Sequence, residues 1–383
     1  MIFWVMLAVL LNGVISFAYS VRAAGDTTLP WAILAVNFVF FTGITQTGAA
    51  FSAIMRLTKS EWGKSYSRLA EILTLSFMPV AAIVFIILYV FGTGRLFYWA
   101  NPVGAHGNPW VGRGLFFWRN VITNALFYIT SYLYFSSGRR EEADAQHFIE
   151  SREKAQAWYG LKKRLNILAG AVCFFYVIAN TAIAWDFGMM IIPEWENSIF
   201  PPYFWSGNLL SGAAFVFLIA FFFMPRGHGK GMDKGALDSM GTVFMGFVLL
   251  WVYMFWSQHI VLWYANVPHL MEPVFKQMSG NFAPIFIFML LTIFVIPFIA
   301  LLFKRLKRST NAMAIIAGLI CAGIWVNRYL MIIPIFSDGG EWIIARWTNI
   351  SLIFGGLAST ILSLIVFFRL FSKRFRLPGI GQR

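Results

Sequence analysis

Charge is scarce in this sequence. Only 12% of its 383 residues are charged, whereas 59% are hydrophobic. A soluble domain of this length carries roughly twice that share of charge, so the composition excludes an ordinary soluble enzyme. Apolar runs recur along the whole chain, and each is long enough to cross a hydrocarbon core of roughly 30 Å. The sequence therefore predicts an all-α integral membrane protein with one polytopic domain over residues 1–383.

Cysteine and histidine are also rare. The two cysteines, Cys173 and Cys321, lie in apolar segments without the spacing of a metal site. Of the five histidines, only His259 falls within a predicted membrane-spanning helix. A membrane haem held by two histidines needs a facing pair, and an iron–sulfur cluster needs several cysteines. We therefore expect no haem or iron–sulfur cluster in this chain and no metal ligands; in redox chemistry, metals would come from partners.

Ten membrane-spanning helices are predicted. They are expected near residues 2–21, 31–55, 69–92, 115–136, 165–185, 204–224, 240–263, 282–303, 311–333 and 347–370. The charged stretch 139–164 is interpreted as a short amphipathic helix outside the membrane.

The connections between these helices alternate in charge. Loops 56–68, 139–164, 226–238 and 304–308 and the tail from Arg369 hold 23 of the 30 Lys and Arg residues. All of them fall on one side if the chain spans the membrane ten times, and the positive-inside rule then places both termini in the cytoplasm. The net charge of +14 indicates contacts with anionic lipids rather than nucleic acid.

A few ionisable residues lie within or beside the predicted helices, where each needs a partner. They are Glu71, Arg119, Asp186, His259 and Arg328. Helix direction puts the last three near the non-cytoplasmic ends of their helices. Two interpretations remain open: a proton-handling pocket, or ion pairs that fix helix packing, such as Asp186 with Arg328.

Glu71 also has two interpretations. It lies three residues after Arg68, a spacing that permits a salt bridge on one helix face. Alternatively, its carboxylate admits protons from the cytoplasmic side.

Several segments together resemble a known family. They are N-F-V-F-F-T-G-I-T-Q-T-G from residue 37, G-R-L-F-Y-W from 94, W-D-F-G-M-M-I-I-P-E-W from 185, W-S-Q-H-I-V-L-W-Y-A-N-V-P from 256 and N-R-Y-L-M-I-I-P from 327. The chain resembles the NrfD/polysulfide-reductase membrane subunits over about residues 31–336. Within that family it is most similar to the quinol-interacting subunits of alternative complex III, called ActC and ActF.

The resemblance implies a quinone or quinol site near the periplasmic side of a bacterial inner membrane. On this chain it suggests Asp186 and His259 as catalytic residues; Glu71 is the candidate for a proton path because of its position in the predicted helix. Glu194 stands where the ActF pattern often has histidine, and His259 where it often has an aromatic residue. The implied quinone pocket consists of Glu194, Arg328, Tyr264, Trp185, Trp205 and Gln258.

The implied function is that of a membrane subunit of a respiratory or photosynthetic oxidoreductase. It would exchange electrons between menaquinone or ubiquinone and a periplasmic iron–sulfur or cytochrome c partner, with or without proton translocation. Expected partners are an iron–sulfur subunit, a multihaem cytochrome c or molybdopterin-type subunit, and a second NrfD-like membrane subunit. A secondary transporter and a purely structural anchor are the alternatives; we find no internal repeat that would favour a transporter.

Overall fold

The computed structural model describes residues 2–23, 27–100, 112–145, 152–193, 195–223, 234–337 and 346–371. Within these ranges the chain is helical and contains no strand. The long helices are α1 (Ile2–Ala23), α2 (Thr28–Leu57), α3 (Lys64–Ile87), α5 (Arg113–Ala145), α6 (Arg152–Ala184), α7 (Phe200–Phe223), α8 (Lys234–Ala265), α13 (Thr310–Phe336) and α14 (Trp347–Phe371). Shorter α-helices are α4 (Thr93–Leu96), α9 (Pro268–Lys276), α10 (Ala283–Leu290), α11 (Ile296–Leu302) and α12 (Lys304–Lys307).

Nine helices in the described ranges are long and apolar enough to cross a membrane. One of them, Gly280–Leu302, combines α10 and α11 with the 3-10 turn η5 (Gly280–Phe282) and the π-helical turn η6 (Leu291–Val295). The tenth predicted span corresponds to α5, which is long enough but is not among the nine. Arg119, Asn120 and Asn124 make α5 less apolar than its neighbours. The expected all-helical membrane fold is confirmed.

One expected element is absent. In the described residues of the stretch 139–164 there is no separate amphipathic helix, because 139–145 continue α5 and 152–164 belong to α6. Good helix formers such as Ala, Glu, Lys and Arg dominate this stretch, so both membrane-spanning helices extend beyond their apolar segments. Residues 146–151 lie outside the described ranges.

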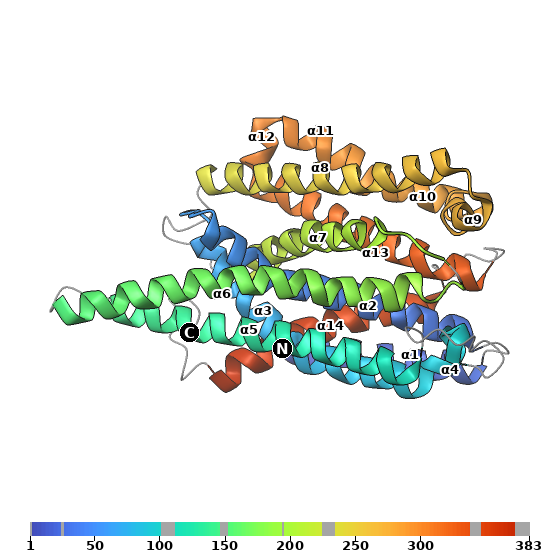
Figure 1. The fold of residues 1–383 in the computed structure, drawn as a ribbon, viewed down its shortest axis with the longest axis horizontal. Helices are drawn as coiled ribbons and strands as arrows, with labels where there is room; N and C mark the ends of the chain where they lie inside the picture. Colours follow the sequence, from blue (N-terminus) through green and yellow to red (C-terminus); the bar gives the residue numbers. More distant parts are fainter. Residues whose placement is uncertain are drawn as a thin grey trace.

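The long helices run roughly parallel to one another (Figure 1). Helices α2, α7 and α13 pack against each other and form the most buried part of the bundle. In Figure 1, α8, α10, α11 and α12 lie along one side of this centre, and α1, α3, α5 and α14 along the other. Because α2 also packs against α3 and α6, its polar side chains lie within reach of several other helices.

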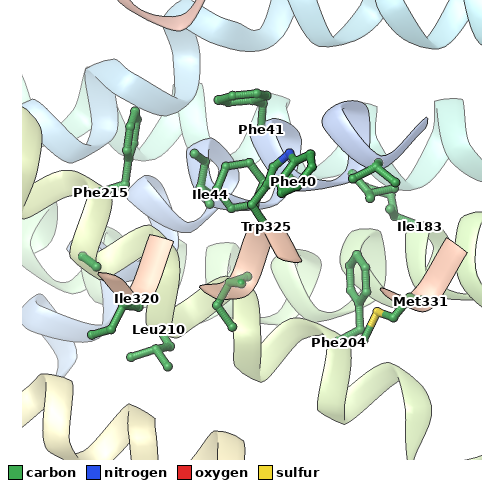
Figure 2. Packing of buried hydrophobic residues seen from close by; sticks show 14 of the residues in the cluster. Phe40, Phe41, Ile44, Ile183, Phe204, Leu210, Phe215, Ile320, Trp325 and Met331 are labelled. Carbon is green, nitrogen blue, oxygen red and sulfur yellow. The ribbon is translucent and has the colours of Figure 1, made fainter. Parts of the chain in front are cut away.

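The centre of the bundle is densely packed with aromatic and branched side chains (Figure 2). Phe40, Phe41 and Ile44 of α2 lie near Trp325 of α13, and Leu210 of α7 lies near Ile320. Lipid tails are as apolar as these residues, so burial from water contributes little to helix association here. Close packing and buried hydrogen bonds, such as Trp325 Nε1 donating to Asn37 Oδ1 at 3.2 Å, therefore carry much of the specificity.

Helix α1 packs mainly against α14, and two glycines set the distance between them. A Cβ atom on Gly13 would come within 3.0 Å of the Cα of Gly355. Small residues at such crossings let backbones approach closely in membranes.

Candidate functional site

Asp186 occupies an irregular turn at the end of α6. There the α-helix gives way to the π-helical turn η4 (Trp185–Met189), closed by a 2.7 Å hydrogen bond from Met190 N to Trp185 O. Such π turns add one residue per turn and occur often at functional sites. Asp186 is completely buried, so its carboxylate depends on protein partners rather than water.

Those partners come from α5. Arg119 forms an ion pair with Asp186, with Nε 3.0 Å from Oδ2 and Nη2 contacting Oδ1. Asn120 Nδ2 donates to the same carboxylate, 2.6 Å from Oδ2. The pairing of Asp186 with Arg328 suggested by the sequence is not found. Arg119, on the helix beside α6, neutralises the carboxylate instead.

A long groove lies directly beyond Asn120. This lateral groove has a volume of about 940 Å³ and runs between α3 and α5, with α2 at its floor and Phe367 of α14 contributing to the wall. On α5 it extends from Asn120 to Arg140, which is roughly 30 Å at 1.5 Å per residue. Its remaining lining residues are Phe38, Thr42, Leu75, Met78, Ala81, Ala82, Phe85, Val121, Asn124, Ala125, Tyr128, Ile129, Tyr132, Phe135, Ser136 and Arg139.

The groove lining is mostly apolar, but it includes three buried polar groups without a hydrogen-bond partner. They are Asn120 Oδ1, Thr42 Oγ1 and Tyr128 Oη, on side chains that are 2%, 2% and 8% exposed. The Tyr128 hydroxyl lies near Gln46 but forms no hydrogen bond of ordinary geometry with it. Buried polar groups are normally satisfied, so three unsatisfied groups on side chains that line one groove make this groove the candidate ligand site.

The orientation of the Asn120 amide is fixed by its neighbours. Its Nδ2 donates both to Asp186 and to the carbonyl oxygen of Phe116, at 2.6 and 2.9 Å. Both partners can only accept while Asp186 is ionised, so the amide nitrogen must face them and Oδ1 remains available as an acceptor. Asp186 itself does not line the groove; Asn120 stands between the carboxylate and the groove.

A second ionic cluster lies at the other end of the groove. Arg68 contacts Glu71 at 2.6 Å, as the three-residue spacing predicts, and Ser52 donates to Glu71 at 2.6 Å. Arg56 of α2 forms a double hydrogen bond with Glu141 of α5 at 2.8 and 2.9 Å. Glu71 is buried but remains close to the groove end, since Arg68 also donates to the carbonyl of the groove residue Phe135.

The other residues predicted for the quinone pocket do not line the lateral groove. Arg328 is buried in the α7–α13 contact, and Gln258 is buried on α8. His259 contacts the carbonyl of Phe255 through Nδ1 at 2.7 Å and packs on that ring. Tyr264 is 86% exposed at the end of α8, as expected of an interface anchor.

The two tryptophans of the predicted pocket are partly exposed: Trp185 in η4 and Trp205 on α7. Glu194 lies outside the described residues.

Neutral amides are what the sequence reasoning missed. Asn120, Asn124 and Gln46 carry no charge, so a search for ionisable groups passes over them. A usable signal was present in the spacing: Asn120, Asn124 and Tyr128 recur every four residues on α5, which places them on one helix face.

The described part of the chain is thus a polytopic helical membrane protein with a buried ion pair beside a long groove. A family model described as "Polysulphide reductase, NrfD" matches residues 22–336, and the chain belongs to this family. Its members are membrane subunits that interact with quinones in redox complexes and associate with iron–sulfur and molybdopterin-type subunits. A search of curated proteins found no match. Within the described ranges, no group of three His, Cys, Asp or Glu side chains gathers as a metal site.

Proposed function

We propose that this chain is the quinone-interacting membrane subunit of a respiratory or photosynthetic oxidoreductase and that the lateral groove receives the quinone. The observation that carries this proposal is the set of three buried, unpartnered polar groups on Asn120, Thr42 and Tyr128. A quinone ring with two oxygen substituents supplies the missing partners, and the apolar length of the groove suits an isoprenoid tail.

The chain's own groups would bind and orient the ring. Asn120 Oδ1 accepts a hydrogen bond from a quinol hydroxyl, while the hydroxyls of Thr42 and Tyr128 donate to ring oxygens. Asp186 acts through Asn120, because it holds the amide nitrogen and leaves the amide oxygen free to accept a hydrogen bond. Quinol oxidation must also release protons, and Asp186 is the nearest buried carboxylate to Asn120 that could accept one.

Electrons from the quinol must pass to another subunit, because we expect no iron–sulfur cluster or haem in this chain to accept them. We propose that they pass to an iron–sulfur or cytochrome c partner at the end of the bundle that carries η4 and α9. The orientation predicted from charge makes this the periplasmic side of a bacterial inner membrane, and the donor is menaquinol or ubiquinol. A multihaem or molybdopterin-type subunit and a second NrfD-like subunit complete the proposed assembly.

Binding of menadione tests the proposal. We expect the full chain in lipid nanodiscs to bind this neutral naphthoquinone in isothermal titration. Tyr128→Phe should raise the Kd about fivefold, because one net hydrogen bond is worth about 1 kcal/mol. Tyr132→Phe is the matched control, since Tyr132 lines the same groove with an exposed side chain. A wild-type chain that takes up no menadione beyond empty nanodiscs would contradict the proposal.

Glu71 is proposed as a proton entry point from the basic end of the bundle. If it carries protons, Glu71→Gln should leave quinol oxidation within about twofold while reducing the protons moved per electron, because glutamine cannot titrate. The measurement is a pH-sensitive dye in proteoliposomes containing the assembled complex.

Glu61→Gln is the control for Glu71→Gln. Glu61 also pairs with a basic residue three positions away, Lys64, but on the exposed surface. An unchanged proton-to-electron ratio in Glu71→Gln would leave Glu71 with a packing role only.

A further inference from the structure

Four side-chain amides form a continuous row between α13 and the lateral groove. Arg328 Nη2 donates to Asn208 Oδ1 at 3.0 Å, and Asn208 Nδ2 donates to Asn180 Oδ1 at 2.8 Å. Asn180 Nδ2 then donates to Gln46 Oε1 at 3.1 Å, and Gln46 Nε2 to Asn124 Oδ1 at 2.6 Å. The row ends where Asn124 Nδ2 donates to the backbone oxygen of Asn120 at 2.9 Å. It therefore crosses five helices: α13, α7, α6, α2 and α5.

Both ends of this row fix its direction. An arginine side chain can only donate hydrogen bonds, and a backbone carbonyl can only accept them. With Arg328 at one end and the Asn120 carbonyl at the other, no amide can reverse without setting two donors or two acceptors face to face. Asn180 Nδ2 also donates to the carbonyl of Tyr176 at 3.0 Å, which fixes the middle of the row in the same sense.

The aligned amides point their positive ends toward α5, the helix that lines one side of the groove. In each amide the oxygen faces Arg328 and the NH₂ group faces α5. Hydrogen bonds aligned in this way polarise one another in a medium of low dielectric constant. Asn124, the last amide, lines the groove, as does Asn120 beside it.

Arg328 is unusual because its charge lies in the interior with only neutral partners. Its side chain is fully buried. Besides Asn208, the guanidinium donates to the carbonyl of Phe204 at 2.6 Å and to Asn327 Oδ1 at 3.0 Å. It also lies 4.0 Å from the centre of the Phe204 ring. Among the described residues no carboxylate pairs with it, so its charge is not neutralised locally, and a buried charge without a counter-ion is costly to keep.

We propose that Arg328 is a positioning residue that acts on the groove through this amide row and makes the groove favour ligands carrying negative charge. The proposal rests on the groove being the quinone site. Asn and Gln amides do not titrate, so the row transmits electrostatic potential and orientation rather than protons. Its consequence is that the anionic reduced forms of a quinone, the semiquinone anion and the quinol anion, are favoured by a residue that does not touch the ring.

Two naphthoquinones of similar size test this. Menadione is neutral, whereas lawsone, with a hydroxyl in place of the methyl group, is an anion near neutral pH. Both are titrated into the full chain in nanodiscs made of zwitterionic lipid. Arg328→Met should weaken lawsone binding about fivefold, a size that one charge can supply over the length of the amide row at an effective dielectric constant of about 20, and should change menadione binding less than about twofold. Arg328→Lys, which keeps the charge, should restore most of the lawsone affinity.

Two further variants keep the test decisive. Met331→Leu removes a contact to Arg328 Nη1 at 3.1 Å but leaves the amide row intact, so lawsone binding should not change. Asn180→Leu interrupts the row without touching Arg328 and should weaken lawsone selectively. If Arg328→Met does not fold, as judged by thermal unfolding and gel filtration, Asn180→Leu alone tests the proposal.

The outcomes separate this inference from the proposed function. Equal loss of both ligands, or no change in either, in Arg328→Met and Asn180→Leu would overturn the role of Arg328 while the groove remains a quinone site. If the wild-type chain binds neither naphthoquinone, or if filling the groove with Ala125→Trp leaves binding unaffected, the proposed function fails and the inference with it.

Discussion

Asp186→Asn should lower kcat/KM for quinol oxidation by the assembled complex about 100-fold. A buried donor or acceptor left mismatched costs about 1–3 kcal/mol. The variant also loses the carboxylate that could accept a proton. In the native chain, Arg119 and Asn120 both donate to the Asp186 carboxylate. An asparagine keeps only one of the two acceptor oxygens. If that oxygen stands in place of Oδ2, it still accepts from Arg119 Nε and Asn120, but the new NH₂ group faces Arg119 Nη2; if it stands in place of Oδ1, the new NH₂ group faces the NH₂ group of Asn120. In either orientation two donors face each other in the buried site.

The matched control for this variant is Asp238→Asn. Asp238 also contacts basic side chains, Lys307 and Arg308. It lies at the partly exposed end of α8, a helix that contributes no residue to the groove lining. It should leave turnover unchanged. Assembly is followed by co-purification of the partner subunits, because Asp186→Asn also removes the negative charge that Asp186 presents to the buried Arg119. Wild-type kcat/KM in correctly assembled Asp186→Asn complex would exclude a role for this carboxylate.

Ala125→Trp should abolish quinone binding and turnover, which makes it the second large effect. Ala125 lines the groove on α5, next to Asn124, and Ala82 lines it on α3. An indole there would occupy the space that a ring or its tail must use. We expect menadione Kd to rise at least about 50-fold, because overlap with protein atoms cannot be relieved in a packed helix bundle.

Leu126→Trp is the control for this change, because the next residue on α5 is exposed and does not line the groove. Both variants add the same side chain to the same helix. A similar loss in both would indicate a general effect on α5, and full turnover in Ala125→Trp would show that the quinone binds elsewhere.

Much of the scaffold was predictable, because the hydrophobic stretches of membrane helices are long and their lengths are set by the bilayer. Helix ends were less so: the polar extensions of α5 and α6 over residues 139–145 and 152–164 depend on helix propensity beyond the apolar segment. The orientation of the termini remains a prediction from loop charges.

The site was predictable only in part. Asp186 was identified because a charge within an apolar segment is conspicuous, but its partner was not. Helices α5 and α6 are adjacent along the chain, yet which residues face each other depends on the rotation of each helix and on the η4 turn, neither of which hydrophobicity determines. The amides were missed for a related reason: a single buried Asn is common, and only the three-dimensional arrangement shows that Gln46, Asn124 and Asn180 join.

The position of the groove on the flank of the bundle has one more consequence. Ile129 and Tyr132 both line it and are largely exposed, so its wall faces the bilayer sideways rather than opening only at an aqueous end. A lipid-soluble substrate would then arrive by diffusion in two dimensions. Its saturation would follow the mole fraction of substrate in the lipid, and diluting the membrane with additional lipid would slow uptake even at a constant total amount of quinol.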